Sequence, residues 1–144
     1  MTFEIKIVSH GETETQALAS KLVPLLRPGD LLVLKGELGA GKTVFVRGLA
    51  EALGLDTETV NSPSYTVVNE YPGERPLFHF DLYRVQDPSE LYEIGWDDYL
   101  GRRGLIVVEW GDKAAECLPP AYYLVDFQII DEKTRQINLT HVKS

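Results

Sequence analysis

The chain has 144 residues, a length typical of one domain, so a nucleotide-binding domain and a separate substrate domain do not both fit. Its 14 basic and 22 acidic residues give a net charge of −8, which opposes direct binding of a nucleic-acid backbone. The single cysteine, Cys117, excludes an internal disulfide and a multi-cysteine metal site. No apolar run approaches the ~20 residues that cross a bilayer, and residues 1–8 lack a signal-peptide pattern. We therefore expect one cytoplasmic domain over residues 1–144, without a membrane segment.

The first half of the chain alternates between strand and helix patterns. Residues 1–8 alternate polar and apolar side chains, which predicts a strand. Residues 13–16 fit a capping box, so a helix is predicted to begin at Thr13 and to stop before Pro28. The apolar run at residues 31–34 predicts a strand buried on both faces, and the apolar spacing of residues 43–53 predicts a second helix.

The second half is richer in strands. Turn residues at 72–75 separate two alternating segments, residues 65–71 and 77–83, which predicts a β-hairpin. The further predicted elements are a helix that begins after Asp87 and is interrupted at Gly95, a buried strand at 105–108, and a closing hairpin of residues 122–130 and 135–142. Together these elements predict an α/β fold with a mixed central sheet, flanking helices and β-hairpins.

Residues 36–43 read Gly-Glu-Leu-Gly-Ala-Gly-Lys-Thr, which matches the P-loop pattern and lies between a predicted strand and a predicted helix. Glycines in such a loop let backbone N–H groups point at phosphate oxygens, and the following helix N-terminus adds partial positive charge. Lys42 is expected to reach the β- and γ-phosphates of ATP or ADP, and the Thr43 hydroxyl is expected to bind Mg²⁺. The predicted fold is therefore P-loop NTPase-like. The residues expected to bind the nucleotide are Glu37, Leu38, Gly39, Ala40, Gly41, Lys42 and Thr43.

Two acidic residues are the candidates for the chemistry. Glu109 follows the apolar run 105–108, where the Walker B carboxylate of a P-loop fold belongs, and it can bind Mg²⁺ directly, through water, or polarise the attacking water. Asp81 shares a face of its predicted strand with His79 and Tyr83. It can orient the attacking water or support the metal, but a surface pair of Asp81 with Arg84 explains the pattern equally well.

Two further features have both a functional and a structural interpretation. Residues 62–66 combine a proline with three hydroxyl side chains, so they fit a switch loop that senses the γ-phosphate, or an ordinary turn before a strand. Trp96 and Trp110 can stack on a base or a partner, although aromatic residues at the ends of helices and strands are more often part of the core.

In chain order, the P-loop, residues 62–66, residues 79–84, residues 90–95 and residues 108–110 resemble the motifs of the bacterial TsaE (YjeE) family, over roughly residues 9–110. The resemblance implies an ATPase that helps to make threonylcarbamoyladenosine in tRNA, with TsaD and TsaB as its partners and tRNA reached only through them. It also implies that residues 37–43 hold the phosphates, that Thr43 and Glu109 bind Mg²⁺, and that Asp81 is required for hydrolysis. The closing hairpin carries no motif of the family.

Two other functions remain open from the residues alone. A small-molecule P-loop kinase needs an acceptor pocket and usually an arginine-rich lid, for which the chain has little room. A nucleotide-dependent regulatory switch of the GTPase type fits the D-x-x-G match at residues 98–101, but no buried strand precedes it and no [NT]-K-x-D motif follows. For an ATPase, the start of the first helix is a candidate adenine site, and hydrolysis is expected to be slow until a partner orders the loops around Ser62 and Asp81.

Overall fold

Seven strands form one mixed sheet in the computed structural model, which describes residues 3–37, 39–56 and 67–143. The order across the sheet is β1-β7-β6-β2-β5-β4-β3. The neighbours β6, β2, β5 and β4 run parallel, whereas β1, β7 and β3 pair antiparallel with their neighbours. The strands are β1 (Phe3–Ser9), β2 (Leu31–Lys35), β3 (Val68–Tyr71), β4 (Leu77–Asp81), β5 (Leu105–Glu109), β6 (Ala121–Ile129) and β7 (Arg135–Lys143). The predicted mixed sheet with two hairpins is confirmed.

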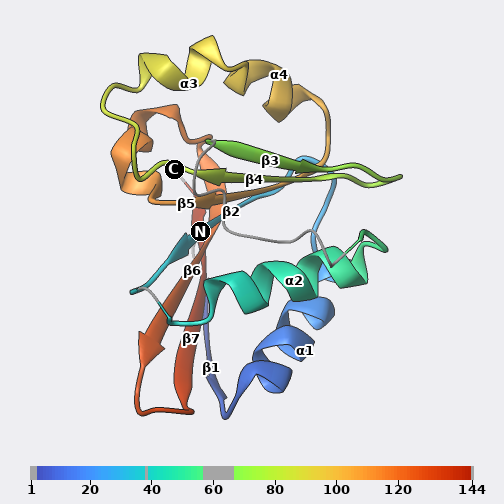
Figure 1. Cartoon of the computed structure of the whole chain (residues 1–144), viewed down its shortest axis with the longest axis vertical. Coiled ribbons are helices and arrows are strands. Elements are labelled where there is room, and N and C mark those ends of the chain that lie inside the picture. Colours follow the sequence, from blue (N-terminus) through green and yellow to red (C-terminus); the bar gives the residue numbers. More distant parts are fainter. Residues whose placement is uncertain (1–2, 38, 57–66, 144) are drawn as a thin grey trace.

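Helices cover both faces of this sheet, as Figure 1 shows. On one face lie α1 (Glu12–Leu22) and α2 (Lys42–Ala52), which pack against each other, and on the other lie α3 (Ser89–Glu93) and α4 (Trp96–Gly101). Two 3-10 segments, η1 (Val23–Leu25) and η3 (Gly111–Cys117), follow α1 and β5. The longest described helices have 11 residues, and none in the described ranges is long and apolar enough to cross a membrane.

The core has two layers because the central strands are buried on both faces. In β2, Leu32 and Leu34 contribute to a cluster with α1 and α2, whereas Leu31 and Val33 contribute to a second cluster with α3, α4 and η3. The apolar side chains of β5 are divided between the same two clusters, and all five residues of this strand are buried. Successive side chains of a strand point to opposite faces, so a continuous apolar run fits this position. The predicted buried strands are confirmed.

Several details differ from the sequence prediction, including the end of the first helix, which lies at Leu22 rather than just before Pro28. The first helix begins at Glu12 rather than Thr13, and the predicted capping box is wrong, because Gly11 takes the N-cap position without a side-chain cap. Instead, the carboxylate of Glu14 accepts the backbone N–H of His10 at 2.8 Å. The strand β4 ends at Asp81, so Tyr83 lies in the following turn and does not share a strand face with that aspartate. The predicted switch loop at residues 62–66 lies outside the described residues.

Candidate functional site

The P-loop joins the end of β2 to the start of α2, as the sequence predicts. Gly39 and Gly41 have φ angles of 84° and 106°, in the left-handed region that favours glycine. Gly36 is required by space, since a Cβ there would lie 2.9 Å from the carbonyl oxygen of Phe127. The glycines therefore allow a tight turn around the N-terminus of α2, the arrangement that suits an anion.

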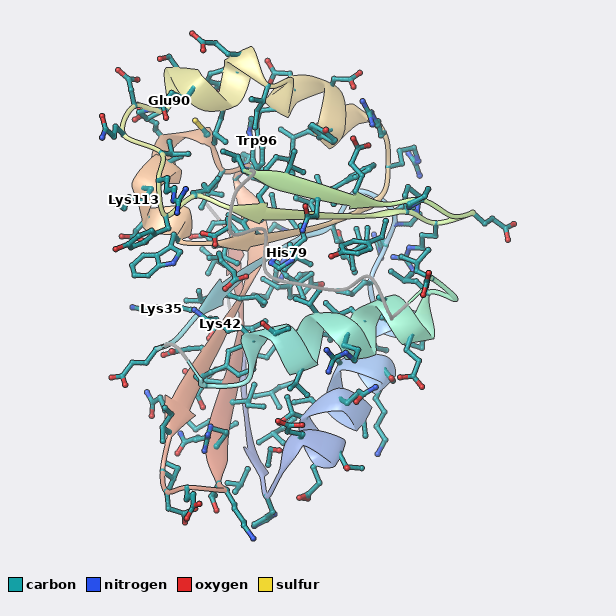
Figure 2. All side chains as sticks on the ribbon, viewed as in Figure 1. Lys35, Lys42, His79, Glu90, Trp96 and Lys113 are labelled. Carbon is teal, nitrogen blue, oxygen red and sulfur yellow. The ribbon has the colours of Figure 1, made fainter. Side chains whose placement is uncertain are left out.

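Lys42 points back into this turn rather than into solvent. Its Nζ donates to the carbonyl oxygen of Gly36 at 2.7 Å and lies 3.5 Å from Oε1 of Glu109. The other carboxylate oxygen of Glu109, Oε2, lies 2.6 Å from Nε2 of His79. Figure 2 shows Lys42 at the beginning of α2 and His79 between α2 and the strands above it. Three side chains from α2, β4 and β5 thus meet at the carboxyl ends of two parallel strands.

The charge of Glu109 is maintained although the residue is only 6% exposed. Burial raises the pKa of Glu109, but the hydrogen bond and charge of His79 and the charge of Lys42 lower it by more than burial raises it. The pKa of Glu109 therefore lies below the ordinary value of 4.5. Glu109 is therefore a carboxylate at neutral pH, and as a carboxylate it only accepts hydrogen bonds.

Asp81 lies beside Glu109, because the two residues are paired in the parallel register of β4 and β5. Asp81 is half-buried, and its Oδ1 accepts the backbone N–H of Tyr83 at 3.0 Å. His79 lies two residues earlier on the same strand and so on the same face. The structure thus brings both predicted acidic residues to the end of the sheet where the P-loop lies.

The remaining predicted nucleotide-binding residues have different surroundings. Glu37 is exposed, whereas Ala40 is fully buried and donates its backbone N–H to the carbonyl oxygen of Glu37 at 3.0 Å. Thr43 is half-buried and is the second residue of α2. Leu38 lies outside the described residues. The loop backbone, rather than the side chains of these residues, is therefore what the site offers to a phosphate.

The oxygen donors of the site fit a magnesium ion that is shared with phosphate. Glu109 offers a carboxylate and Thr43 a hydroxyl, and both are hard oxygen ligands. Within the described ranges, no group of three or more His, Cys, Asp or Glu residues can hold a metal by itself. Mg²⁺ typically takes one or two protein ligands and completes its shell with phosphate oxygens and water. The donor set therefore suits a metal that arrives with a nucleotide.

Arg135 also belongs to the site, although the sequence does not predict it there. Its Nη2 donates to the carbonyl oxygen of Gly39 in the P-loop at 3.2 Å, across 96 positions of the chain. Its Nη1 also donates to the carbonyl oxygens of Asp131 at 2.7 Å and Thr134 at 3.1 Å, in the turn between β6 and β7. One guanidinium thus links the closing hairpin to the phosphate loop. No local pattern predicts this contact, because Arg135 belongs to no recognised motif.

Two cavities lie on either side of the P-loop. The smaller, of about 360 Å³, lies between the start of α1, the P-loop and the β6–β7 turn, and its lining includes His10, Thr15, Gly41, Val44 and Arg135. The larger, of about 970 Å³, follows β6 on the opposite face, and apolar side chains such as Val33, Leu118, Tyr122 and Leu124 line much of it. Lys42 and Trp110 lie at its P-loop end.

The two tryptophans have different environments. Trp96 is 1% exposed, packs edge-to-face on Phe80 with ring centroids 4.9 Å apart, and donates Nε1–H to the carbonyl oxygen of Cys117. The core interpretation is therefore correct for Trp96. Trp110 is 41% exposed, its ring centroid lies 5.9 Å from Lys42 Nζ, and the ring lies 5.0 Å from that of Tyr83. Trp110 is thus the tryptophan that borders the P-loop.

Comparison with known proteins identifies the family. Residues 9–137 match the family described as "Threonylcarbamoyl adenosine biosynthesis protein TsaE". The chain is 42% identical to the tRNA threonylcarbamoyladenosine biosynthesis protein TsaE of Bacillus subtilis, over 90% of this chain and 80% of that protein. It is 33% identical to the protein of the same name from Treponema pallidum, over 94% of this chain and 99% of that one. The crystal structure of Bacillus subtilis YdiB superposes with a TM-score of 0.81 and 34% identity, covering 99% of this chain and 88% of that chain. The chain belongs to the TsaE family.

Proposed function

We propose that this protein binds ATP with Mg²⁺ at its P-loop and hydrolyses it as an accessory subunit in the synthesis of tRNA threonylcarbamoyladenosine. In this proposal the protein works in the cytoplasm with TsaD and TsaB, which carry the transfer chemistry, and meets tRNA only through them. The observation that carries the proposal is the position of Lys42, whose Nζ lies between the Gly36 carbonyl and a buried Glu109 carboxylate at the start of a helix. Membership of the TsaE family supports the pathway.

The phosphates are assigned to the backbone of residues 37–43, with Lys42 as the cation that meets them. Lys42 is already held beside the loop, so it has to exchange its contacts with Gly36 and Glu109 for phosphate oxygens. Thr43 and Glu109 are assigned to Mg²⁺, which when bound neutralises negative charge on the phosphate oxygens. Thr43→Ala is therefore expected to weaken the Mg²⁺-dependent part of ATP binding.

The adenine is assigned to the smaller cavity, at the start of α1. This cavity adjoins Gly41 and Val44, the residues on either side of the Lys-Thr pair, so a nucleotide whose phosphates lie on the loop can extend into it. His10 is exposed there, and Arg135 brings the closing hairpin to the same place. The imidazole and guanidinium planes are surfaces on which a base can stack.

Asp81 is assigned to the attacking water. It lies beside Glu109 in the sheet, but in this structure its Oδ1 accepts the N–H of Tyr83. This hydrogen bond ties the carboxylate to the turn after β4, so a partner that rearranges the turn re-orients the carboxylate toward the water, which supports slow hydrolysis by the isolated chain and faster hydrolysis with its partners. ATP hydrolysis by the isolated protein and by its mixture with TsaD and TsaB tests this assignment. Equal rates would contradict it.

Nucleotide preference is tested by the fluorescence of Trp110, which borders the P-loop. Titration with ATP, ADP and GTP in the presence of Mg²⁺ should change this fluorescence, with ATP and ADP preferred over GTP. Trp96→Phe should keep the response, because Trp96 is buried in the core layer that contains α3 and α4. Trp110→Phe should abolish the response. A strong preference for GTP would favour a regulatory switch and refute the ATPase proposal.

A further inference from the structure

His79 is a buried polar residue that packing does not explain. It lies on β4 with no exposed surface, and its register partner on β5 is the apolar Val107. Its Nδ1 has no hydrogen-bond partner among the residues that the structure describes. A buried polar atom without a partner lowers stability, so an apolar side chain would fill this position at lower cost. The polar contact that the ring makes through Nε2 is therefore the feature to explain.

That contact fixes one oxygen of Glu109. A carboxylate only accepts hydrogen bonds, so the proton between the two atoms belongs to Nε2 of His79, which donates it to Oε2 at 2.6 Å. Oε1 of the same carboxylate lies 3.5 Å from Nζ of Lys42. The two oxygens are thus divided between the ring and the P-loop lysine, and rotation of the carboxylate would break both contacts.

We propose that His79 is a positioning residue, whose Nε2–H holds the carboxylate of Glu109 so that Oε1 faces the phosphate loop. The proposal rests on the proposed function, because the orientation of Glu109 affects Mg²⁺ binding only if Mg²⁺ and ATP bind at this site. Groups that orient a metal ligand through a hydrogen bond typically change metal affinity or activity ~10–100-fold when they are replaced. His79 itself is not expected to touch the nucleotide or the metal.

A matched pair of variants separates the hydrogen bond from the polarity of the side chain. In His79→Gln the amide nitrogen reaches about as far as Nε2 and can still donate to Glu109. In His79→Asn the amide reaches only the level of Nδ1, so the variant stays polar but loses the contact. The measurement is the Mg²⁺ concentration that gives half-maximal ATP binding by calorimetry, with ATP binding in the absence of Mg²⁺ as its reference. Thermal melting of each variant checks that it is folded.

The Asn variant is expected to need at least ~10-fold more Mg²⁺, whereas the Gln variant stays within about threefold of the wild type. ATP binding without Mg²⁺ should change little in either variant. Equal Mg²⁺ requirements for the two variants would overturn the positioning role while leaving the proposed function intact.

A second readout needs no nucleotide. Nitrogen-15 NMR of the nucleotide-free protein should show a proton on Nε2 of His79, and a ring protonated only on Nδ1 would overturn the proposal. If the wild type fails to bind ATP with Mg²⁺ but shows the proton on Nε2, the proposed function fails and the orientation of Glu109 by His79 stands.

Discussion

Replacing Glu109 with Gln removes one negative charge from the buried group that it forms with Lys42 and His79, while the side chain keeps nearly the same shape. The amide oxygen can still accept from His79, so that hydrogen bond is weakened rather than lost, whereas the attraction between Glu109 and Lys42 is removed. The side chains of this pair are only 8% and 12% exposed. Water therefore screens this charge pair poorly, and its removal is expected to lower stability measurably.

The separation of Lys42 Nζ and Glu109 Oε1 sets the magnitude. Two unit charges 3.5 Å apart attract by about 5 kcal/mol at an effective dielectric constant of ~20. Removing one partner of a buried pair costs ~3–5 kcal/mol. Lys42 keeps its hydrogen bond to Gly36 at 2.7 Å, so we expect the lower end of this range, about 3 kcal/mol. For a chain of this size, this corresponds to a fall in Tm of roughly 10 °C.

Thermal unfolding at neutral pH without nucleotide, followed by circular dichroism, measures this loss. The matched control is Glu70→Gln, because Glu70 pairs with Arg102 at 2.9 Å but both side chains are more than 40% exposed. Exposed pairs contribute about 0–1 kcal/mol, so the control should lose at most ~3 °C. Adding Lys42→Met to Glu109→Gln should raise Tm again, because it removes the uncompensated lysine. If Glu109→Gln and Glu70→Gln melt at the same temperature, the reasoning about the buried pair is wrong.

Three further predictions concern packing, pH and turnover. In Gly48→Ala the new Cβ would lie 2.5 Å from the Gln16 carbonyl oxygen, so Tm should fall by roughly 3–6 °C, whereas Gly101→Ala, with nothing within 4 Å, should not lower it. Folding lowers the pKa of Glu109, so the ionised side chain stabilises the folded state fully at pH values above 4.5, the ordinary pKa. This stabilisation is lost as the pH falls through the lower pKa of the folded state. The wild type should therefore lose more stability on acidification than Glu109→Gln. Asp81→Ala should bind ATP normally but hydrolyse it more slowly in the presence of the partners, and normal turnover would refute its assigned role.

The parts of the fold that the sequence predicts are those set by local patterns. The continuous apolar runs at residues 31–34 and 105–108 have few alternatives to buried strands, and they became β2 and β5. The positive φ angles of Gly39 and Gly41 and the lack of space for a Cβ at Gly36 call for glycine, and the glycine spacing in the sequence made the P-loop between β2 and α2 predictable as well. Local sequence patterns determine the ends of helices less strongly than they determine buried strands. Leu25 fits the helical spacing but is 74% exposed, because α1 ends at Leu22 and a 3-10 turn containing Pro24 follows.

The parts that could not be predicted depend on contacts between distant residues. The alternation of β4 places His79 on the same face as Asp81, but only the pairing of β4 with β5 brings its ring to Glu109. Arg135 reaches Gly39 because β6 pairs with β2, and this pairing places the closing hairpin beside the P-loop. A sequence pattern records spacing along one element, and these contacts are set by the order of strands in the sheet.

The most direct test of ATP binding at the P-loop is calorimetric titration of ATP with Mg²⁺ into the wild type, Lys42→Ala and Lys35→Ala. Lys35 is the matched control, because it is an exposed lysine at the end of β2 beside the same loop. A charge-assisted hydrogen bond contributes about 1.5–3 kcal/mol, so Lys42→Ala should bind ATP at least ~10-fold more weakly. The wild type and Lys35→Ala should each bind one ATP per chain. No binding to the wild type, or equal affinity of wild type and Lys42→Ala, would contradict ATP binding at the P-loop.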